Sequence, residues 1–553
     1  MTTSSEQQGE VPSASKSDVS GPHTSAWSPF RYLVFTVLWT ATVISNVGTW
    51  MSNAASGWLM TSLDPAPLTI SLVQVATALP MVLFALPAGA LADILDRRRL
   101  LIVVQLLMAI AAMLLAVLVL TGAMTPWLLL AFTFVGGVGA ALVAPAWQAV
   151  VPQLVPRSDL HAAVALNSVG INISRAIGPA LAGLFIAALG IAAPFFLNAA
   201  SFVCVILALL WWAASRPATG TLPAERFGNA VRTGLRYARE SRPLRATLAW
   251  SASFFLFASA YWALLPLIAR DLVSGGPGFY GILLGTIGVG AVIGAFALPR
   301  LRHWLGPNRL TAVGAVGTAL ALVLFALARD SVTALGASLV SGVTWIAVLS
   351  SLNVSAQVAL PDWVRARGLA VFVTVMFGAM TLGSIMWGQV AEMFGVPIAL
   401  QASAAGALVA VALTWRWKLQ TGAAIDLGPS MHWPAPIVAE DVALERGPVM
   451  VTVEYRIDPK QTLAFVATMN ELASERRRDG AYGWGLFEDA TEPGHWLEFF
   501  LVESWAEHLR QHGRVTKSAA DIQERVKAFQ RGDARPAVVH WLAPISNPEP
   551  PAQ

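Results

Sequence analysis

Charged residues are scarce in this chain, and cysteine is nearly absent. Only 12% of the 553 residues are Asp, Glu, Lys or Arg, whereas 56% are hydrophobic. This composition excludes an ordinary soluble protein and is typical of a chain with many membrane spans. The one cysteine, Cys204, lies inside an apolar run, so we expect neither a disulfide framework nor a cysteine-based metal site. Residues 1–27 lack the apolar core of a signal peptide and are expected to be a disordered cytoplasmic arm.

The formal net charge of +4 is small, and the basic residues are distributed among short loops between apolar runs. They form no continuous stripe along one segment, so we expect no nucleic-acid partner. Basic loops of this kind instead report orientation, because Lys and Arg are retained on the cytoplasmic side of a membrane.

Runs of about 20 apolar residues are long enough to cross a bilayer. The sequence contains twelve such runs, at about 30–53, 68–92, 99–121, 126–147, 161–188, 192–214, 246–269, 278–298, 309–328, 332–356, 367–391 and 396–417. An even number places both ends of the bundle on one side. The basic loops predict that both termini are cytoplasmic in a multi-pass protein of the inner membrane.

The membrane part divides into two similar halves, residues 28–214 and 246–418. The chain after the fourth run contains Gln148 and Pro152, and the chain after the tenth repeats this pair as Gln357 and Pro361. Between the halves, residues 215–245 contain a basic amphipathic helix, most simply one that lies on the anionic inner leaflet. A duplicated six-helix unit is a common transporter plan, with the substrate near the midplane between the halves.

The connection between the second and third runs is short and highly charged. It contains Gly89, Asp93, Asp96, Arg97 and Arg98. This pattern resembles the loop between the second and third helices in the major facilitator superfamily, although Asp96 stands close to where the usual pattern has a glycine. The resemblance implies a gating loop in which Asp93 pairs in one conformational state and is released in the other.

Arg175 lies about fourteen residues into the fifth run and therefore near mid-membrane. A buried arginine is costly unless it faces water or a partner. It either lines a transport cavity or bonds carbonyl groups around a helix break at Gly178 and Pro179. Together with Gly183, this break resembles the glycine-proline motif in the fifth helix of antiporters of the superfamily, the branch that exports compounds.

Other polar and aromatic residues inside the apolar runs are candidates for a substrate cavity. Some of them are expected to line the cavity, and others only to hydrogen-bond between helices. The full candidate set is Asn46, Trp50, Gln74, Asn167, Asn172, Arg175, Tyr261, Trp262, Trp345 and Asn353.

The composition becomes polar after residue 418. Residues 419–447 are proline-rich and are expected to be a linker, and residues 448–545 alternate between strand and helix patterns, followed by a tail at 546–553. Their βαββαβ order predicts a ferredoxin-like sheet covered by helices on one face. The segment resembles the dimeric α/β-barrel domains related to antibiotic-biosynthesis monooxygenases, which implies a homodimer. His508 and His512 have the spacing of two metal ligands on a helix, but a solvated or dimer-interface helix is the favoured interpretation.

The chain as a whole resembles a bacterial branch of the major facilitator superfamily, the transmembrane secretion effectors, and is similar to enterobactin exporters over about residues 28–420. This resemblance implies a secondary active exporter, coupled to protons, for a small hydrophobic, drug-like or siderophore-like molecule. No cofactor and no metal are expected, and the expected partners are the substrate, protons and membrane lipid. Two alternatives remain open: an exporter fused to a small enzyme or ligand-binding domain, and a membrane sensor or scaffold that transports nothing.

Overall fold

The structure is a computed structural model that describes residues 25–212, 227–361, 363–420, 430, 442–532 and 536–544. The expected arm at 1–27 and the expected linker at 419–447 therefore lie mostly outside the described residues. Residues 215–226 of the segment between the halves and the tail at 546–553 lie entirely outside them.

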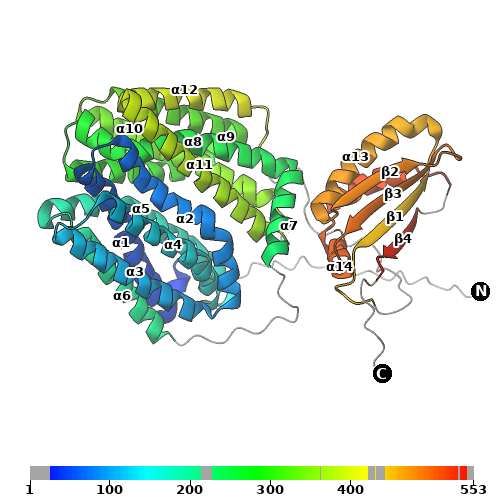
Figure 1. The fold of residues 1–553 in the computed structure, drawn as a ribbon, viewed down its shortest axis with the longest axis horizontal. Coiled ribbons are helices and arrows are strands. Elements are labelled where there is room, and N and C mark those ends of the chain that lie inside the picture. The colour runs from blue at the N-terminus through cyan, green and yellow to red at the C-terminus, as the bar shows by residue number, and fades with distance from the viewer. Residues whose placement is uncertain are drawn as a thin grey trace, which may run out of the picture.

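Long apolar helices make up the membrane part of the chain (Figure 1). Eleven helices within the described residues are long and apolar enough to cross a membrane. They are α1 (Leu33–Leu63), α2 (Pro67–Ile94), α3 (Arg97–Leu120), α4 (Pro126–Val150), α5 (Leu160–Leu189), α6 (Ala193–Trp211), α8 (Arg242–Leu267), α9 (Pro277–Leu327), α10 (Ser331–Val358), α11 (Arg365–Phe394) and α12 (Val396–Thr414).

The 51-residue α9 accounts for two of the twelve predicted spans. Gly306 interrupts its helical backbone with a φ of 68° and a ψ of 165°, and Pro307 follows directly. A positive φ is readily adopted only by glycine, so the break is set by this residue type. The prediction of twelve spans is therefore confirmed, but the first span ends ten residues later than expected, at Leu63.

Helix starts follow from capping side chains and prolines. Asp96 accepts a hydrogen bond from the backbone N–H of Arg99 at 2.8 Å and so caps α3. Asp330 caps α10 in the same way through the N–H of Thr333. Pro67 and Pro126 occupy the first turn of α2 and α4, where a missing N–H costs nothing.

The predicted amphipathic helix is present as α7 (Phe227–Glu240), next to the small domain in Figure 1. Tyr237 and Ala238 are buried against Leu360 and Val364, which lie between α10 and α11, so protein covers this part of the helix. Leu235 of the predicted apolar face is 54% exposed, and the leaflet interpretation stays a prediction. We call this end of the bundle, with the loops at 95–96, 151–159 and 359–364, the basic end.

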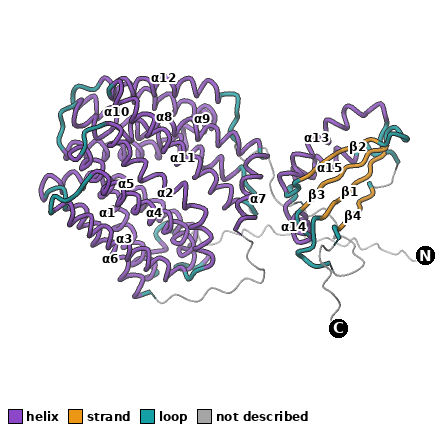
Figure 2. The backbone as a smooth tube through the Cα atoms, viewed as in Figure 1, coloured by secondary structure: helices purple, strands orange, loops and turns teal. Residues whose placement is uncertain are grey.

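The small domain is a four-stranded antiparallel sheet with helices on one face (Figure 2). Its elements are β1 (Val449–Arg456), α13 (Thr462–Asp479), β2 (Gly483–Glu488), β3 (His495–Val502), α14 (Trp505–Arg514), α15 (Lys517–Lys527) and β4 (Ala537–Leu542). The strand order β2-β3-β1-β4 confirms the ferredoxin-like prediction. Alternate residues of β1, including Val453 and Tyr455, pack under Phe465 and Met469 of α13.

Candidate functional site

A positively charged side chain from the first half of the bundle, that of Arg175, lies near the centre of the membrane part. Arg175 projects from α5, and its guanidinium carbon lies 5.2 Å from the ring centroid of Trp50 on α1. This is a cation–π distance, and the contact partly replaces the water that a buried guanidinium loses. Arg175 and Trp50 are both among the residues predicted to line a substrate cavity, and both lie near the middle of their membrane helices.

The second half of the bundle contributes a cluster of aromatic rings. Tyr261 and Trp262 are adjacent on α8, and both rings pack against Trp345 of α10, with centroid distances of 6.4 and 5.3 Å. Phe255 lies 5.2 Å from Trp345 on its other side. Tyr261 is fully buried. The two halves meet next to Arg175, because a Cβ on Gly288 of α9 would lie 2.5 Å from the Cα of Ala176 on α5.

Hydrogen-bond donors in this region are left without partners. The Nε of Arg175, the hydroxyl of Tyr261 and the indole N–H groups of Trp262 and Trp345 are all buried and unpaired among the described residues. Trp262 approaches the Tyr261 hydroxyl, but without hydrogen-bond geometry. Unpaired buried donors are rare because each one forfeits its bonds to water. We call Trp50, Arg175, Tyr261, Trp262 and Trp345 the central cluster.

The remaining cavity candidates separate into two groups. Asn46 lies one helical turn from Trp50 on α1, and Asn172 lies one turn from Arg175 on α5, so both lie on the helix faces that carry the central cluster. Asn167 instead accepts a hydrogen bond from the Trp147 indole at 2.9 Å.

Asn353 donates to the carbonyl of Leu349 in its own helix, at 3.1 Å. Gln74 is half-buried on α2. The bond of Asn167 links α5 to α4, whereas Asn353 bonds within its own helix, as Asn172 does through the carbonyl of Ser168 at 2.8 Å. The assignment of all three to a substrate cavity stays a prediction.

The expected helix break at Gly178 and Pro179 is not present, because α5 continues through both residues to Leu189. The glycines serve close packing instead. A Cβ on Gly178 would lie 2.6 Å from the Cβ of Trp50, and a Cβ on Gly183 would lie 3.1 Å from the Cα of Gly281 on α9. The motif therefore lets α5 approach both α1 and α9, and its proline is accommodated within the packed bundle.

The two halves touch from mid-span to the end opposite the basic end. Beyond the contact between Gly183 and Gly281, Arg270 donates to the carbonyl of Thr61 at 2.6 Å. Glu392 accepts from the N–H of Leu68 at 3.2 Å. These contacts tie α8 and α11 of the second half to α1 and α2 of the first half.

The charged loop at the basic end bonds within the first half. Arg98 donates to the carbonyls of Leu209 and Leu210, at 2.7 and 2.8 Å, and thereby caps the end of α6. Arg97 donates to the carbonyl of Ala149 at 3.3 Å. Gly89 has open space where a Cβ would be. Asp93 lies in the last turn of α2, and its side chain is not among those that the structure describes.

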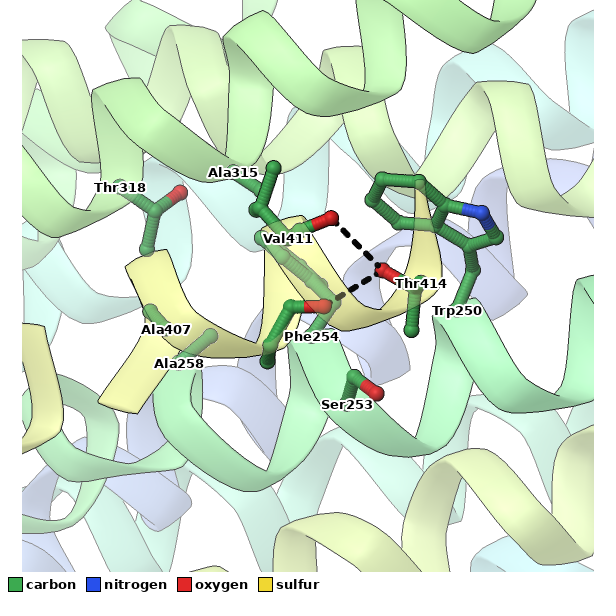
Figure 3. Close-up of a pocket in the computed structure, with 10 residues that line it drawn as sticks. Trp250, Ser253, Phe254, Ala258, Ala315, Thr318, Ala407, Val411 and Thr414 are labelled. Carbon is green, nitrogen blue, oxygen red and sulfur yellow. Dashed lines mark hydrogen bonds between the residues drawn. The ribbon is translucent and has the colours of Figure 1, made fainter. Parts of the chain in front are cut away.

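A small cavity lies between α8, α9 and α12, and Phe254 in its lining packs against Trp345 with ring centroids 6.0 Å apart (Figure 3). Its volume of about 10 Å³ suffices for one water molecule at most. Thr414 lines it and bonds to carbonyls of its own helix, those of Ala410 and Val411. This cavity is too small to hold a substrate.

The small domain has a polar interior that the sequence patterns do not predict. Glu498 is fully buried and accepts hydrogen bonds from Tyr455 at 2.9 Å, Arg476 at 3.2 Å and the Trp484 indole at 3.0 Å. A buried carboxylate with an arginine and two neutral donors is well compensated. The arginine run 476–478 was visible in the sequence, but nothing there identified Glu498 as its partner.

The favoured interpretation of His508 and His512 is wrong for His508. His508 is 1% exposed, and its ring lies 4.7 Å from that of His540 on β4. The Nε2 atoms of His508 and His512 are 3.3 Å apart. Burial lowers the pKa of His508 to about 3 and also lowers the pKa of His512 and of His540, with neighbouring imidazoles contributing for the first two. All three rings are therefore neutral near pH 7.

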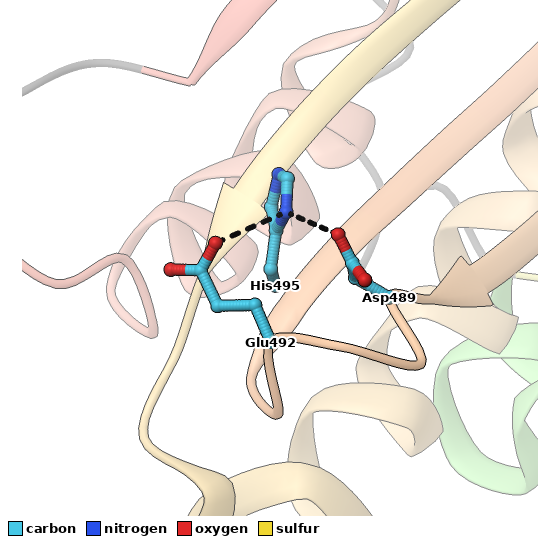
Figure 4. A group of neighbouring side chains, drawn as sticks. All are labelled: Asp489, Glu492 and His495. Atoms are coloured by element: carbon cyan, nitrogen blue, oxygen red, sulfur yellow. Dashed lines mark hydrogen bonds and ion pairs between the residues drawn. The ribbon is translucent and has the colours of Figure 1, made fainter.

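Asp489, Glu492 and His495 lie together at the hairpin between β2 and β3 (Figure 4). His495 Nδ1 is 3.4 Å from Asp489 and 3.7 Å from Glu492. Asp489 also accepts from the N–H and the hydroxyl of Thr491, and these bonds lower its pKa to about 2. The arrangement is explained by turn formation, since exposed acidic groups gather in loops without binding metal.

The small domain contacts the basic end of the bundle. The guanidinium carbon of Arg514 on α14 lies 4.4 Å from the ring centroid of Trp363, just before α11. Trp363 packs edge-on against Tyr237 of α7, and Arg478 of α13 lies over the other ring of this pair, at 5.9 Å from Tyr237. Tyr237 donates to the carbonyl of Ala359 at the end of α10. We call this set of contacts the docking contact.

Comparison with known proteins identifies the family to which this chain belongs. The sequence model of the transmembrane secretion effectors matches residues 24–549. The chain belongs to the transmembrane secretion effector family. The match covers both the membrane part and the small domain of this family member.

Relatives of the family member are named as transporters. It is 22% identical to the staphyloferrin A transporter of Staphylococcus aureus over 63% of this chain and 87% of the relative. It is 26% identical to the multidrug efflux pump Tap of Mycolicibacterium fortuitum over 64% and 88%. It is 27% identical to the enterobactin exporter EntS of Escherichia coli O1:K1 over 49% and 65%.

Solved structures share the fold of the membrane part. A mutant of the nucleoside transporter NupG superposes with a TM-score of 0.60 at 13% identity, covering 70% of this chain and 99% of the transporter. A bacterial homologue of the lysosomal transporter Spinster, in an inward-facing and unoccupied conformation, gives a TM-score of 0.55 at 14% identity, with 70% and 97% covered. The twelve-span transporter fold is therefore confirmed for this secretion effector.

Proposed function

We propose that this chain is a secondary active exporter that moves a small amphipathic molecule out of the cytoplasm by alternating access. The observation that carries the proposal is the close approach of the two halves next to Arg175, where Gly288 of α9 packs on Ala176 of α5 near mid-span. A site built from both halves changes its access when the halves rock against each other. The named relatives, which include exporters of siderophores and drugs, support the outward direction.

We propose further that the basic end faces the cytoplasm, with both termini and the small domain on that side. The positive-inside rule supports this orientation, because Arg97, Arg98 and Arg367 lie at the basic end. The halves touch at the opposite end, so the conformation described is closed outward, and cargo enters from the cytoplasm. Gly89, Asp93 and Asp96 would close this entrance in the opposite state.

A proton gradient is the proposed driving force. Glu392, the carboxylate of α11, lies near the end of its helix, so coupling would run through groups outside the central cluster. Uptake of labelled aromatic molecules of negative, neutral and positive charge into inverted membrane vesicles, driven by an imposed pH gradient, tests export directly. Accumulation of at least one of them that collapses with an uncoupler, and is absent from vesicles without the protein, is the expected result. No gradient-dependent accumulation of any of these molecules, or of any tested drug or siderophore, would contradict the proposal.

The small domain is proposed to dimerise rather than to catalyse. Its open sheet face is apolar, and Phe487, Val539 and Trp541 are 59%, 41% and 53% exposed there. Burying this face against a second copy removes the apolar surface from water. Trp541→Glu should yield monomers in light scattering of the purified full chain, whereas Leu463→Glu on the helix side should not. Dimers that persist in Trp541→Glu would contradict this role.

A further inference from the structure

The polar atoms of the central cluster are donors that lack acceptors. Arg175 Nε and the indole N–H groups of Trp262 and Trp345 can only donate hydrogen bonds, and the Tyr261 hydroxyl has no acceptor either. Arg175 lies next to Ala176, which packs on Gly288 of α9, and α9 packs at Ile287 on Gly342 of α10, about one turn from Trp345. Donors of both halves therefore lie close to the same contact between the halves, without a matching oxygen among the described residues.

The cluster also carries an uncompensated positive charge. The contact that the structure gives the Arg175 guanidinium is the face of Trp50, a weak partner compared with a carboxylate. Among the described side chains of the membrane helices, carboxylates stand at helix ends, as Asp64 and Glu392 do. Keeping an unpaired cation near mid-membrane is costly, and the cost falls when an anion binds.

Aromatic rings surround these donors. Tyr261 and Trp262 have centroids 5.5 Å apart, and Trp345 packs against both. Ring faces next to a guanidinium favour a flat, conjugated molecule whose charged group reaches the donors while its rings stack.

We propose that the cargo of this site is an aromatic anion, whose carboxylate or phenolate accepts hydrogen bonds from Arg175 and from the donors of the second half. This inference rests on the proposed export function and names its substrate class. Because the anion bonds to groups of both halves, it bridges them and favours the state in which they are close. A cationic molecule would meet a like charge and no acceptor.

A charge series of one ring system tests the proposal. Purified full-length protein in detergent is titrated with 2-naphthoate, 2-naphthamide and 2-naphthylmethylammonium, and affinities are measured by calorimetry. We expect 2-naphthoate to bind about 10- to 100-fold more tightly than 2-naphthamide, since hydrogen bonds to charged groups are stronger than neutral ones. Equal affinity for the anion and the amide, or tighter binding of the cation, would overturn the proposal.

Variants locate the effect. Arg175→Gln should lose the preference for 2-naphthoate while its affinity for 2-naphthamide stays unchanged. Arg329 lies at the end of the bundle opposite the basic end and donates to the carbonyl of Ala328. The control variant Arg329→Gln should behave as the wild type. Tyr261→Phe, which removes only a hydroxyl, should lower 2-naphthoate affinity several-fold. Undiminished 2-naphthoate binding in Arg175→Gln would overturn the assignment.

Two further readouts keep the outcomes distinct. Without ligand, Arg175→Gln should unfold at the same or a higher temperature than the wild type, because an unpaired buried charge is removed; a lower melting temperature would mean that the arginine has a structural role and would contradict the proposal. Selective anion binding without gradient-driven transport in vesicles would refute export alone. Transport without charge preference would refute the anion assignment alone.

Discussion

Arg175 and His508 are both ionisable side chains placed inside the protein, and they meet the cost of burial in opposite ways. Arginine cannot release its proton, so Arg175 stays charged and requires an electron-rich partner, which Trp50 supplies only in part. His508 is instead held neutral, because burial lowers its pKa to about 3. Arg175 therefore favours the binding of an anion, whereas His508 makes the stability of the small domain decrease at acidic pH.

We expect the small domain to lose stability as the pH falls from 6.5 towards 3. In that window the unfolded chain protonates His508 and the folded domain does not, so protons favour unfolding. One such histidine costs about 2 kcal/mol between pH 6.5 and 5, at 1.36 kcal/mol for each pH unit. Hydrogen exchange of residues 505–514 in the purified full chain measures this loss.

His508→Gln should weaken the pH dependence of this exchange by the contribution of one titrating histidine. His495→Gln at the exposed hairpin should leave it unchanged. Protection that is constant from pH 7 to 5 in the wild type would contradict a neutral, buried His508.

At the scale of elements, the crossing of α5 and α9 decides how closely the two halves approach. Gly183 and Gly281 face each other there, and a Cβ on Gly281 would lie 2.8 Å from the carbonyl oxygen of Pro179. Two backbones meet without intervening side chains, so any larger residue must separate the helices. The crossing is thus one seal between the halves on the side away from the basic end, beside the contact of α2 with α11.

Gly281→Val should open this seal. The added side chain overlaps backbone that cannot move aside, and overpacking of this kind costs about 1–3 kcal/mol. With Asn46→Cys introduced into a Cys204→Ser background, labelling by an impermeant maleimide from the outer side should accelerate about 5- to 100-fold.

Gly278→Val is the matched control, because Gly278 lies three residues away with open space at its Cβ position. It should label at the rate of the parent. Equal labelling of Gly281→Val and Gly278→Val would show that the α5–α9 crossing does not seal the outer side.

Sequence periodicity was sufficient for most elements and failed where contact partners decide the structure. Apolar run length predicts the spans, and alternation predicts the strands, because both depend on local burial. Pro179 predicts a break because proline strongly disrupts an isolated helix, but packing against α1 and α9 keeps α5 continuous. The amphipathic pattern of α7 shows that one face is covered, without naming Trp363 and Arg478 as neighbours of Tyr237.

The candidate site was predictable to a similar degree. The depth of Arg175 and the position of Trp50 along the chain indicated a cavity, and both belong to the central cluster. Asn167 could not be assigned, because its hydrogen bond to Trp147 depends on how α4 and α5 pack. The contact of Ala176 with Gly288, next to Arg175, joins different halves, and a single sequence contains no signal for that contact.

At the scale of the whole molecule, the docking contact links the small domain to the segment between α10 and α11. Arg514 lies over Trp363 and is held by Glu507 and by the carbonyl of Asp479, so its position is fixed from the domain side. Trp363 lies two residues before α11. When α11 moves as the halves rock, the position of Trp363 therefore changes, and the docking contact must shift or break.

Trp363→Ala should release the small domain from the bundle. A desolvated cation–π contact contributes about 2 kcal/mol, so the undocked population should rise about 30-fold. Faster hydrogen exchange at residues 505–514 and 234–240 measures undocking, and Trp304→Ala, at a tryptophan that is 77% exposed, should leave exchange unchanged. Unaltered exchange in Trp363→Ala would exclude the docking contact as the main attachment.

The central claim is that two six-helix halves move against each other around the cluster that contains Arg175 and Tyr261. Spin labels on Thr61→Cys and Arg270→Cys report the distance between the halves at the outer end, and labels on Arg98→Cys and Trp304→Cys report it at the basic end, each pair in the Cys204→Ser background. Pulsed electron resonance of the reconstituted protein, with and without cargo, is the direct measurement. The account predicts that the outer distance increases while the basic-end distance decreases; changes of the same sign, or none at either end, would contradict it.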